Sequence, residues 1–89
     1  MLLAIDIGNS NIVLGGIDEG AIVFEARIAT DHIKTSDQYG MEIRNMLEFF
    51  HVDLDTVEDC IISSVVPPVF NAVHTGIIKL TRRKPMVVG

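Results

Sequence analysis

A short polar turn between two apolar runs is the feature that most constrains this chain. The runs cover residues 2–5 and 12–14, and Asp6-Ile7-Gly8-Asn9-Ser10 lies between them. An apolar run that leads into such a turn predicts a buried strand, which carries the Asp6 carboxylate to its carboxyl end. Gly8 lets a ligand approach the backbone, while Asn9 and Ser10 add an amide and a hydroxyl. These groups suit a Mg²⁺-bound polyphosphate, although a tight hairpin in which Asp6 and Asn9 only satisfy backbone groups is the alternative.

Length and composition limit the class of protein. Eighty-nine residues suit one domain without a second, and an apolar fraction of 48% predicts a hydrophobic core rather than disorder. No apolar stretch approaches the roughly 20 residues of a membrane span, and the first residues lack the pattern of a signal peptide. A formal charge of -5 argues against nucleic acid as a partner. We therefore expect a cytoplasmic protein with neither a membrane nor a nucleic acid as partner.

The cysteine and histidine pattern favours neither a disulfide nor a metal site. Cys60 is the only cysteine and is predicted to be a small core residue. The histidines, which we expect at the surface or at helix ends, are His32, His51 and His74. The one basic cluster, residues 82–84, is predicted to follow a helix C-terminus, where cations complement the helix dipole.

The hydrophobic periodicity predicts an α/β chain. Strands are expected over residues 2–7, about 11–17, 21–28, 60–66 and 86–88, and helices over residues 36–50 and from 67 to about 81. The order β-β-β-α-β-α-β describes a three-strand meander followed by right-handed crossovers. This is the order of the ribonuclease-H-like mixed sheet that also builds actin, the Hsp70 ATPase and sugar kinases. The first strand is expected at the centre of that sheet.

Several single residues have a structural interpretation. Gly15 and Gly16 predict a bulge or close backbone packing in the second strand. Thr35 and Gln38 predict a capping box at the first helix. Further expectations place Asp37 at that helix N-terminus and Tyr39 and Phe50 in the core. Ser63 or Ser64 is expected to cap the second helix, and contact of their hydroxyls with an anion is the alternative. Arg27 is expected either to reach a phosphate or a partner subunit, or to pair with Glu25 or Asp31.

Three motifs together resemble the type III pantothenate kinases. The first is Asp6-Ile7-Gly8-Asn9-Ser10-Asn11, similar to the family's Asp-x-Gly-Asn-Thr/Ser turn. The second joins Arg27-Ile28-Ala29-Thr30 to Thr35-Ser36-Asp37-Gln38-Tyr39-Gly40, with Gln38 where the family commonly has Glu. The third is Ser63-Ser64-Val65-Val66-Pro67, similar to the family's strand-to-helix junction.

The resemblance implies phosphoryl transfer from ATP to pantothenate, the first step of coenzyme A synthesis, by a homodimer that uses Mg²⁺ and a monovalent cation, K⁺ or NH4⁺. It places donor phosphate on residues 6–11, meaning Asp6, Ile7, Gly8, Asn9, Ser10 and Asn11, with Asp6 also holding the metal. The family's enzymes have two domains, and residues 1–89 correspond to the first. The base, the pantothenate contacts and the monovalent-cation ligands are expected in the missing part, so we expect this chain to be inactive alone.

Two other functions fit the same residues. One is a non-catalytic kinase-like module that serves assembly or regulation. The other is the first domain of a different small-molecule kinase of the sugar-kinase or acetate-kinase type, since the fold alone does not specify a substrate.

Overall fold

A computed structural model describes residues 1–88, and its elements follow the predicted order. In chain order they are β1 (Leu2–Ile7), β2 (Asn11–Asp18), β3 (Ala21–Ala29), α1 (Ser36–Phe49), the 3-10 helix η1 (Leu54–Thr56), β4 (Asp59–Ser64), α2 (Pro67–Thr81) and β5 (Met86–Val88). The order β-β-β-α-β-α-β is confirmed, and η1 is an addition inside a segment that the sequence predicts as a polar connection. The last residue of the predicted domain, Gly89, lies outside the described residues.

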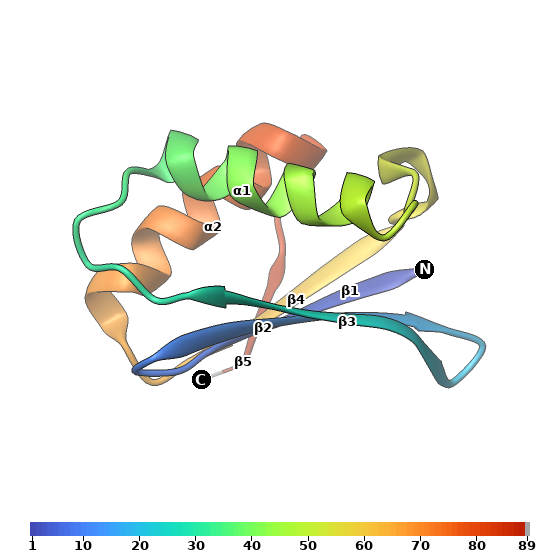
Figure 1. The fold of residues 1–89 in the computed structure, drawn as a ribbon, viewed down its shortest axis with the longest axis horizontal. Coiled ribbons are helices and arrows are strands. Elements are labelled where there is room, and N and C mark those ends of the chain that lie inside the picture. The colour runs from blue at the N-terminus through green and yellow to red at the C-terminus, as the bar shows by residue number, and fades with distance from the viewer. Residues whose placement is uncertain (89) are drawn as a thin grey trace.

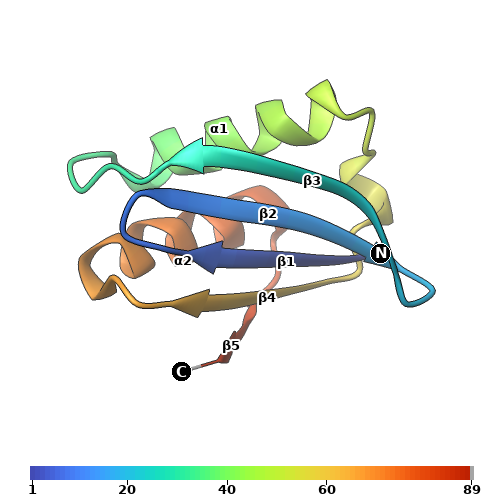
Figure 2. The ribbon, with the colours of Figure 1, turned by 60° about the horizontal axis from the view of Figure 1, so that its bottom comes forward.

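The strands form one mixed sheet in the order β3-β2-β1-β4-β5. Strand β1 pairs antiparallel with β2 and parallel with β4, so it lies at the centre, as predicted. Both helices cover the same side of the sheet, and the opposite side faces the viewer in Figure 2. We call this opposite side the open face. Residues on β1 therefore alternate between the core and the open face, with Leu3, Ile5 and Ile7 buried and Asp6 exposed.

Each helix contributes one apolar stripe to the core. The fully buried positions of α1 are Tyr39, Ile43 and Leu47, and those of α2 include Val69, Val73 and Ile77. The prediction that Phe50 is a core residue is wrong, because its exposed fraction is 37%. Helix α1 ends at Phe49, and Phe50 is the C-cap, with its ring beside Phe24 at the edge of the core.

The ends of both helices follow local sequence rules. At α1, Thr35 and Gln38 form the predicted capping box, and Asp37 lies in the first turn. Strand β4 ends two residues earlier than predicted, because Val66 is already the N-cap that precedes Pro67. After α2, Arg82 adopts the left-handed conformation, so residues 82–84 follow the helix C-terminus as predicted.

Glycines allow close packing at two places. The β2–β3 register shifts between Gly16 and Ile17, which confirms the predicted bulge. A Cβ on Gly16 would lie 2.4 Å from the Phe24 ring, so the close packing there is with a side chain, and Gly15 has no such neighbour within residues 1–88. Helices α1 and α2 cross at Gly40 and Gly76. A Cβ on Gly76 would lie 2.7 Å from the Ser36 carbonyl oxygen, so the two backbones are almost in contact.

The segment that joins β3 to α1 is held by one buried phenol. The Tyr39 hydroxyl accepts a hydrogen bond from the Asp31 N–H (2.8 Å) and donates one to the Asp31 carbonyl oxygen (2.7 Å). On the surface, Asp37 of α1 pairs with Lys79 of α2 at 2.7 Å. The Thr35–Gly40 motif therefore has a structural role, because it begins α1, holds the segment before it and packs α1 against α2.

Candidate functional site

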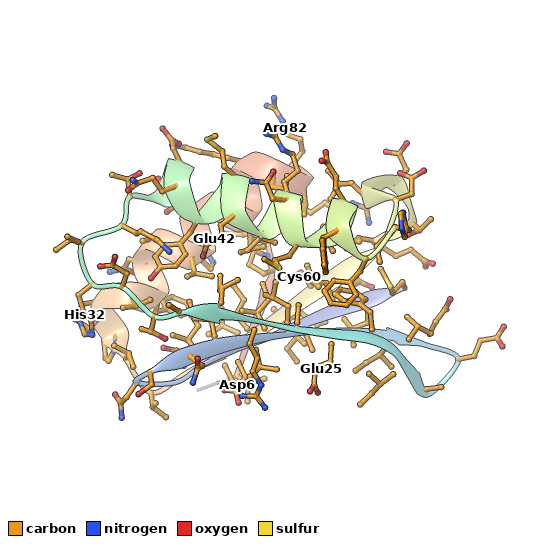
Figure 3. The ribbon with its side chains drawn as sticks, in the orientation of Figure 1. Asp6, Glu25, His32, Glu42, Cys60 and Arg82 are labelled. Carbon is orange, nitrogen blue, oxygen red and sulfur yellow. The ribbon has the colours of Figure 1, made fainter. Side chains whose placement is uncertain are left out.

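Asp6 occupies the open face of the central strand, close to the carboxyl end of β1. Figure 3 shows its side chain pointing away from the helices. Ser63 is its register partner on the parallel strand β4, and the Ser63 hydroxyl donates a hydrogen bond to Asp6 Oδ1 at 3.0 Å. Within residues 1–88, Asp6 Oδ2 accepts no hydrogen bond. One carboxylate oxygen is thus oriented by a serine, while the other is available to a ligand.

The turn that follows Asp6 is fixed by backbone contacts and by Thr30. The Gly8 N–H donates to the Asn11 carbonyl oxygen at 2.9 Å across the turn. Thr30, just beyond β3, donates from its hydroxyl to the Gly8 carbonyl oxygen (2.8 Å) and from its N–H to the Ser10 carbonyl oxygen (3.0 Å). The carbonyl oxygens of Gly8 and Ser10 therefore accept hydrogen bonds from Thr30, which limits the conformations that the turn can adopt.

The N–H groups at the tip of the turn are differently placed. Asn9 and Ser10 are exposed, and neither backbone N–H donates a hydrogen bond within residues 1–88. The Asn9 side chain also makes no such bond there, and Asp6 accepts only from Ser63. The alternative interpretation, in which Asp6 and Asn9 serve to satisfy backbone groups of the hairpin, is therefore not what the structure shows. The free donors instead form a polar tip suited to an anion.

The predicted site residues separate into two groups. Asp6, Gly8, Asn9 and Ser10 present backbone or side-chain groups at the carboxyl edge of β1. The Ile7 side chain is completely buried in the core, so only its backbone lies in this region, and its carbonyl oxygen accepts from the Val65 N–H at 3.2 Å. Asn11 is exposed at the start of β2, where its carbonyl oxygen closes the turn.

The expectation that Ser63 or Ser64 caps α2 is wrong. The N-cap is Val66, which makes no side-chain capping bond, and the Ser64 hydroxyl accepts from the N–H of Val66 itself, two residues further along the chain, at 3.0 Å. Ser63 instead belongs to the Asp6 site. Asp6 and Ser63 are each the fifth of six residues in neighbouring parallel strands, and the predicted strand over residues 60–66 misses this match because β4 begins one residue earlier.

The donor chemistry around Asp6 fits a magnesium ion shared with a polyphosphate. Mg²⁺ is typically held by one or two carboxylates, several waters and substrate phosphates rather than by an all-protein cage. Asp6 provides one carboxylate with a free oxygen, and no group of three or more Asp, Glu, His or Cys residues in residues 1–88 is arranged to hold a metal by itself. A hollow of about 360 Å³ on the open face reaches Asp6 and Ser63 but includes no residue of the turn from Gly8 to Asn11.

Arg27 and Cys60, the remaining titratable candidates, form no hydrogen bond or ion pair with Asp6 within residues 1–88. Arg27 lies on the open face two strands from Asp6 and forms no ion pair with Glu25 or Asp31 within the described part of the chain. Cys60 lies between the sheet and the helices, and burial raises the pKa of its thiol to about 12. This confirms its prediction as a core residue.

Two of the three histidines have the predicted kind of position, whereas His74 lies in the middle of α2 instead of at the surface or at a helix end. His32 and His51 are exposed, and His51 follows the end of α1. His74 is half-buried on α2 with its ring centroid 5.2 Å from that of Phe70. In the described residues, neither helix has the length and apolar character needed to cross a membrane.

Comparison with known proteins connects this geometry to a family. The profile of the family described as type III pantothenate kinase matches residues 2–89. The chain belongs to this family. Relatives named type III pantothenate kinase include those of Bifidobacterium adolescentis (44% identical), Syntrophotalea carbinolica (42%) and Exiguobacterium sibiricum (39%). Each match covers 100% of this chain and 35% of the relative, so the chain spans about a third of the length of these type III pantothenate kinases.

Proposed function

We propose that this chain is the nucleotide-phosphate-binding part of a kinase that transfers the γ-phosphate of ATP to pantothenate, the first step of coenzyme A synthesis. Membership of the type III pantothenate kinase family supports the reaction class. The observation that carries the proposal is the pairing of the Asp6 carboxylate with Ser63, immediately before a turn whose Asn9 and Ser10 N–H groups are free within residues 1–88.

Phosphoryl transfer depends mainly on positioning and charge neutralisation, and each residue of the site has a part in that task. Asp6 would hold Mg²⁺ or one of its waters through the oxygen that Ser63 leaves free. The free backbone N–H groups of Asn9 and Ser10, together with the side chains of these two residues, would contact donor phosphate oxygens. Mg²⁺ neutralises phosphate charge when bound. Thr30 keeps the turn in place, so it acts as a positioning residue.

The rest of the proposal follows the family resemblance. The pantothenate contacts, the general base and the ligands of K⁺ or NH4⁺ belong to the part of the enzyme that lies beyond this chain, and residues 1–89 form an incomplete first domain. The complete enzyme is proposed to work as a homodimer in the cytoplasm. The isolated chain is proposed to bind nucleotide without turning it over.

Calorimetry with ATP and Mg²⁺ tests the donor site in the 89-residue chain itself. We expect weak, Mg²⁺-dependent binding that Asp6→Ala abolishes. Asp18→Ala is the matched control. Asp18 is also an exposed carboxylate, but it lies at the end of β2 that is far from the Gly8–Ser10 turn. Circular dichroism confirms that each variant is folded. Absence of binding heat for the folded unsubstituted chain would contradict the proposed donor site and favour a non-catalytic module.

A fusion of this chain to the remaining two-thirds of the Bifidobacterium adolescentis relative tests the reaction. Pantothenate-dependent release of ADP is the expected activity. In that fusion Asp6→Asn should lower kcat about a hundredfold or more with a smaller effect on the KM for ATP, because the Mg²⁺ contact strengthens as charge develops. Activity with another acceptor but none with pantothenate would show a different small-molecule kinase.

A further inference from the structure

Strand β3 is an edge of the sheet with one side free of pairing within residues 1–88. It contains nine residues, Ala21–Ala29, and its single neighbour in the sheet is β2. Figure 2 shows β3 as the outermost strand at the side opposite β5. A long edge strand of this kind presents a row of unused N–H and C=O groups, which favours pairing with another strand.

The register with β2 identifies which backbone groups face outward. The Thr30 N–H donates to the Ser10 carbonyl oxygen, which marks these two residues as a hydrogen-bonded pair. Hydrogen-bonded and non-hydrogen-bonded pairs alternate along an antiparallel ladder. Ile28, Ala26 and Phe24 therefore direct their N–H and C=O groups toward β2. The corresponding groups of Arg27 and Glu25 point away from the sheet, toward the free side.

The side chains at this edge carry opposite charges two residues apart. Glu25 and Arg27 both lie on the open face, both are exposed, and neither forms an ion pair within residues 1–88. Figure 3 shows Glu25 pointing away from the helices, like Asp6. Edge charges of a single sign would repel an identical strand. Glu25 and Arg27 have opposite signs, so in one antiparallel register each lies opposite the other residue of a second copy of β3.

The helix side of the same edge is apolar. Met46, Phe49 and Phe50 at the end of α1 line a hollow of about 370 Å³ together with Glu25, Ala26 and Arg27. Phe49 has an exposed fraction of 73%, and its ring packs edge-on against Phe50. An exposed aromatic cluster beside unused backbone groups is a typical composition for a protein interface.

We propose that β3 pairs antiparallel with β3 of a second copy of this chain, with the twofold axis at Ala26. In this register Glu25 of each copy lies opposite Arg27 of the other, and both residues have the outward N–H and C=O groups that such a pair exchanges. Shifting the axis to residue 25 would place Glu25 opposite Glu25, and shifting it to residue 27 would oppose two arginines. The proposed axis also brings the two Phe49 clusters to the same side of the joined sheet.

This inference names the surface of the homodimer in the proposed function, but it does not depend on the kinase chemistry. Glu25 lines the same open-face hollow as Asp6, so nucleotide binding is measured on the unsubstituted chain and the variants are used for association alone. Binding heat with ATP and Mg²⁺ in a chain that stays monomeric would overturn only the β3 interface. A dimer with the expected variant responses and no binding heat would overturn only the donor site.

A charge swap followed by sedimentation equilibrium tests the register on the 89-residue chain. Glu25→Arg and Arg27→Glu should each raise the dimer dissociation constant by about fivefold or more, because each creates two like-charge pairs across the axis. The double variant should restore association to near the original level. Failure of the double variant to recover while both single variants weaken association would overturn the proposed register.

Two further variants test the backbone and the aromatic contacts. Arg27→Pro removes an N–H that faces away from β2, so the monomer should fold while dimerisation is lost, and Arg27→Ala is its control for the side chain. Phe49→Asp should also weaken association, whereas Met41→Asp, a change of an exposed residue on the far side of α1, should not. A chain that is monomeric at all concentrations, or a dimer that both Arg27→Pro and Phe49→Asp leave intact, would overturn the proposal.

Discussion

Replacing Gly76 with alanine tests whether the two helices are held at the shortest distance that their backbones allow. A Cβ at this position would lie 2.7 Å from the Ser36 carbonyl oxygen and 3.0 Å from the Gly40 nitrogen. Both are backbone atoms of α1, so neither can move aside as a flexible side chain would. The helices must separate to accept the methyl group, and this disturbs packing between buried residues of α1 and α2.

Two opposing contributions decide the sign of the effect. Alanine is favoured over glycine in a helix interior by about 1 kcal/mol. Forcing an extra carbon into a packed contact costs about 1–3 kcal/mol. Because the approach is below any ordinary contact distance, we expect the steric cost to exceed the gain and stability to fall by up to about 2 kcal/mol. At Gly40 the added Cβ would lie 3.2 Å from the Gly76 carbonyl oxygen, so Gly40→Ala should cost less.

Thermal and urea unfolding of the two variants provide the measurement. In a domain of this size, a change of 1 kcal/mol shifts Tm by about 4–8 °C, which circular dichroism resolves easily. We expect the order of stability to be unsubstituted chain, then Gly40→Ala, then Gly76→Ala. A Gly76→Ala variant as stable as the unsubstituted chain would refute the inference that this helix crossing is sterically limited.

Three other substitutions have defined outcomes. Tyr39→Phe should lower stability by about 1–3 kcal/mol in urea unfolding, because both backbone groups of Asp31 lose their partner. Thr30→Val should cost about 1 kcal/mol and reduce the calorimetric heat with ATP and Mg²⁺, whereas Thr30→Ser should retain binding. Because burial raises the pKa of Cys60 from 9.0 to about 12, the unfolded chain loses this proton first as the pH rises. Stability should therefore fall by up to about 1.4 kcal/mol per pH unit across that interval, and Cys60→Val should flatten the dependence.

The element order was predictable because each boundary has a local cause. Alternating apolar residues identify the strands, Thr35 and Gln38 form the cap of α1, and Pro67 fixes the start of α2. The errors in the predicted positions occur where tertiary contacts decide how a residue packs. Phe50 continues the apolar stripe of α1 in the sequence, but the helix ends one residue before it, and the ring then packs against Phe24 at the edge of the sheet.

The site was predictable only as far as its residues are close in sequence. The turn after β1 has a local pattern, so Asp6 and residues 8–10 could be identified directly. Ser63 and Thr30 reach the site through strand pairing, over separations of 57 and 22 residues in their hydrogen bonds. Nothing local to either residue distinguishes a site contact from a helix cap or a strand end, so of the two roles open to the serines the sequence favoured the cap, which the structure does not show.

The position of Asp6 argues for a ligand rather than for a structural role. It is a charged residue in the central strand, where an apolar side chain would normally be expected. The fold tolerates it because residues 1–88 leave the open face uncovered, and the core on the other face is complete without it. Its single side-chain contact, with Ser63, orients one oxygen and leaves the other free. A carboxylate that the sheet does not need, held beside a turn that Thr30 keeps in place, supports the proposal that Asp6 serves a ligand rather than the fold.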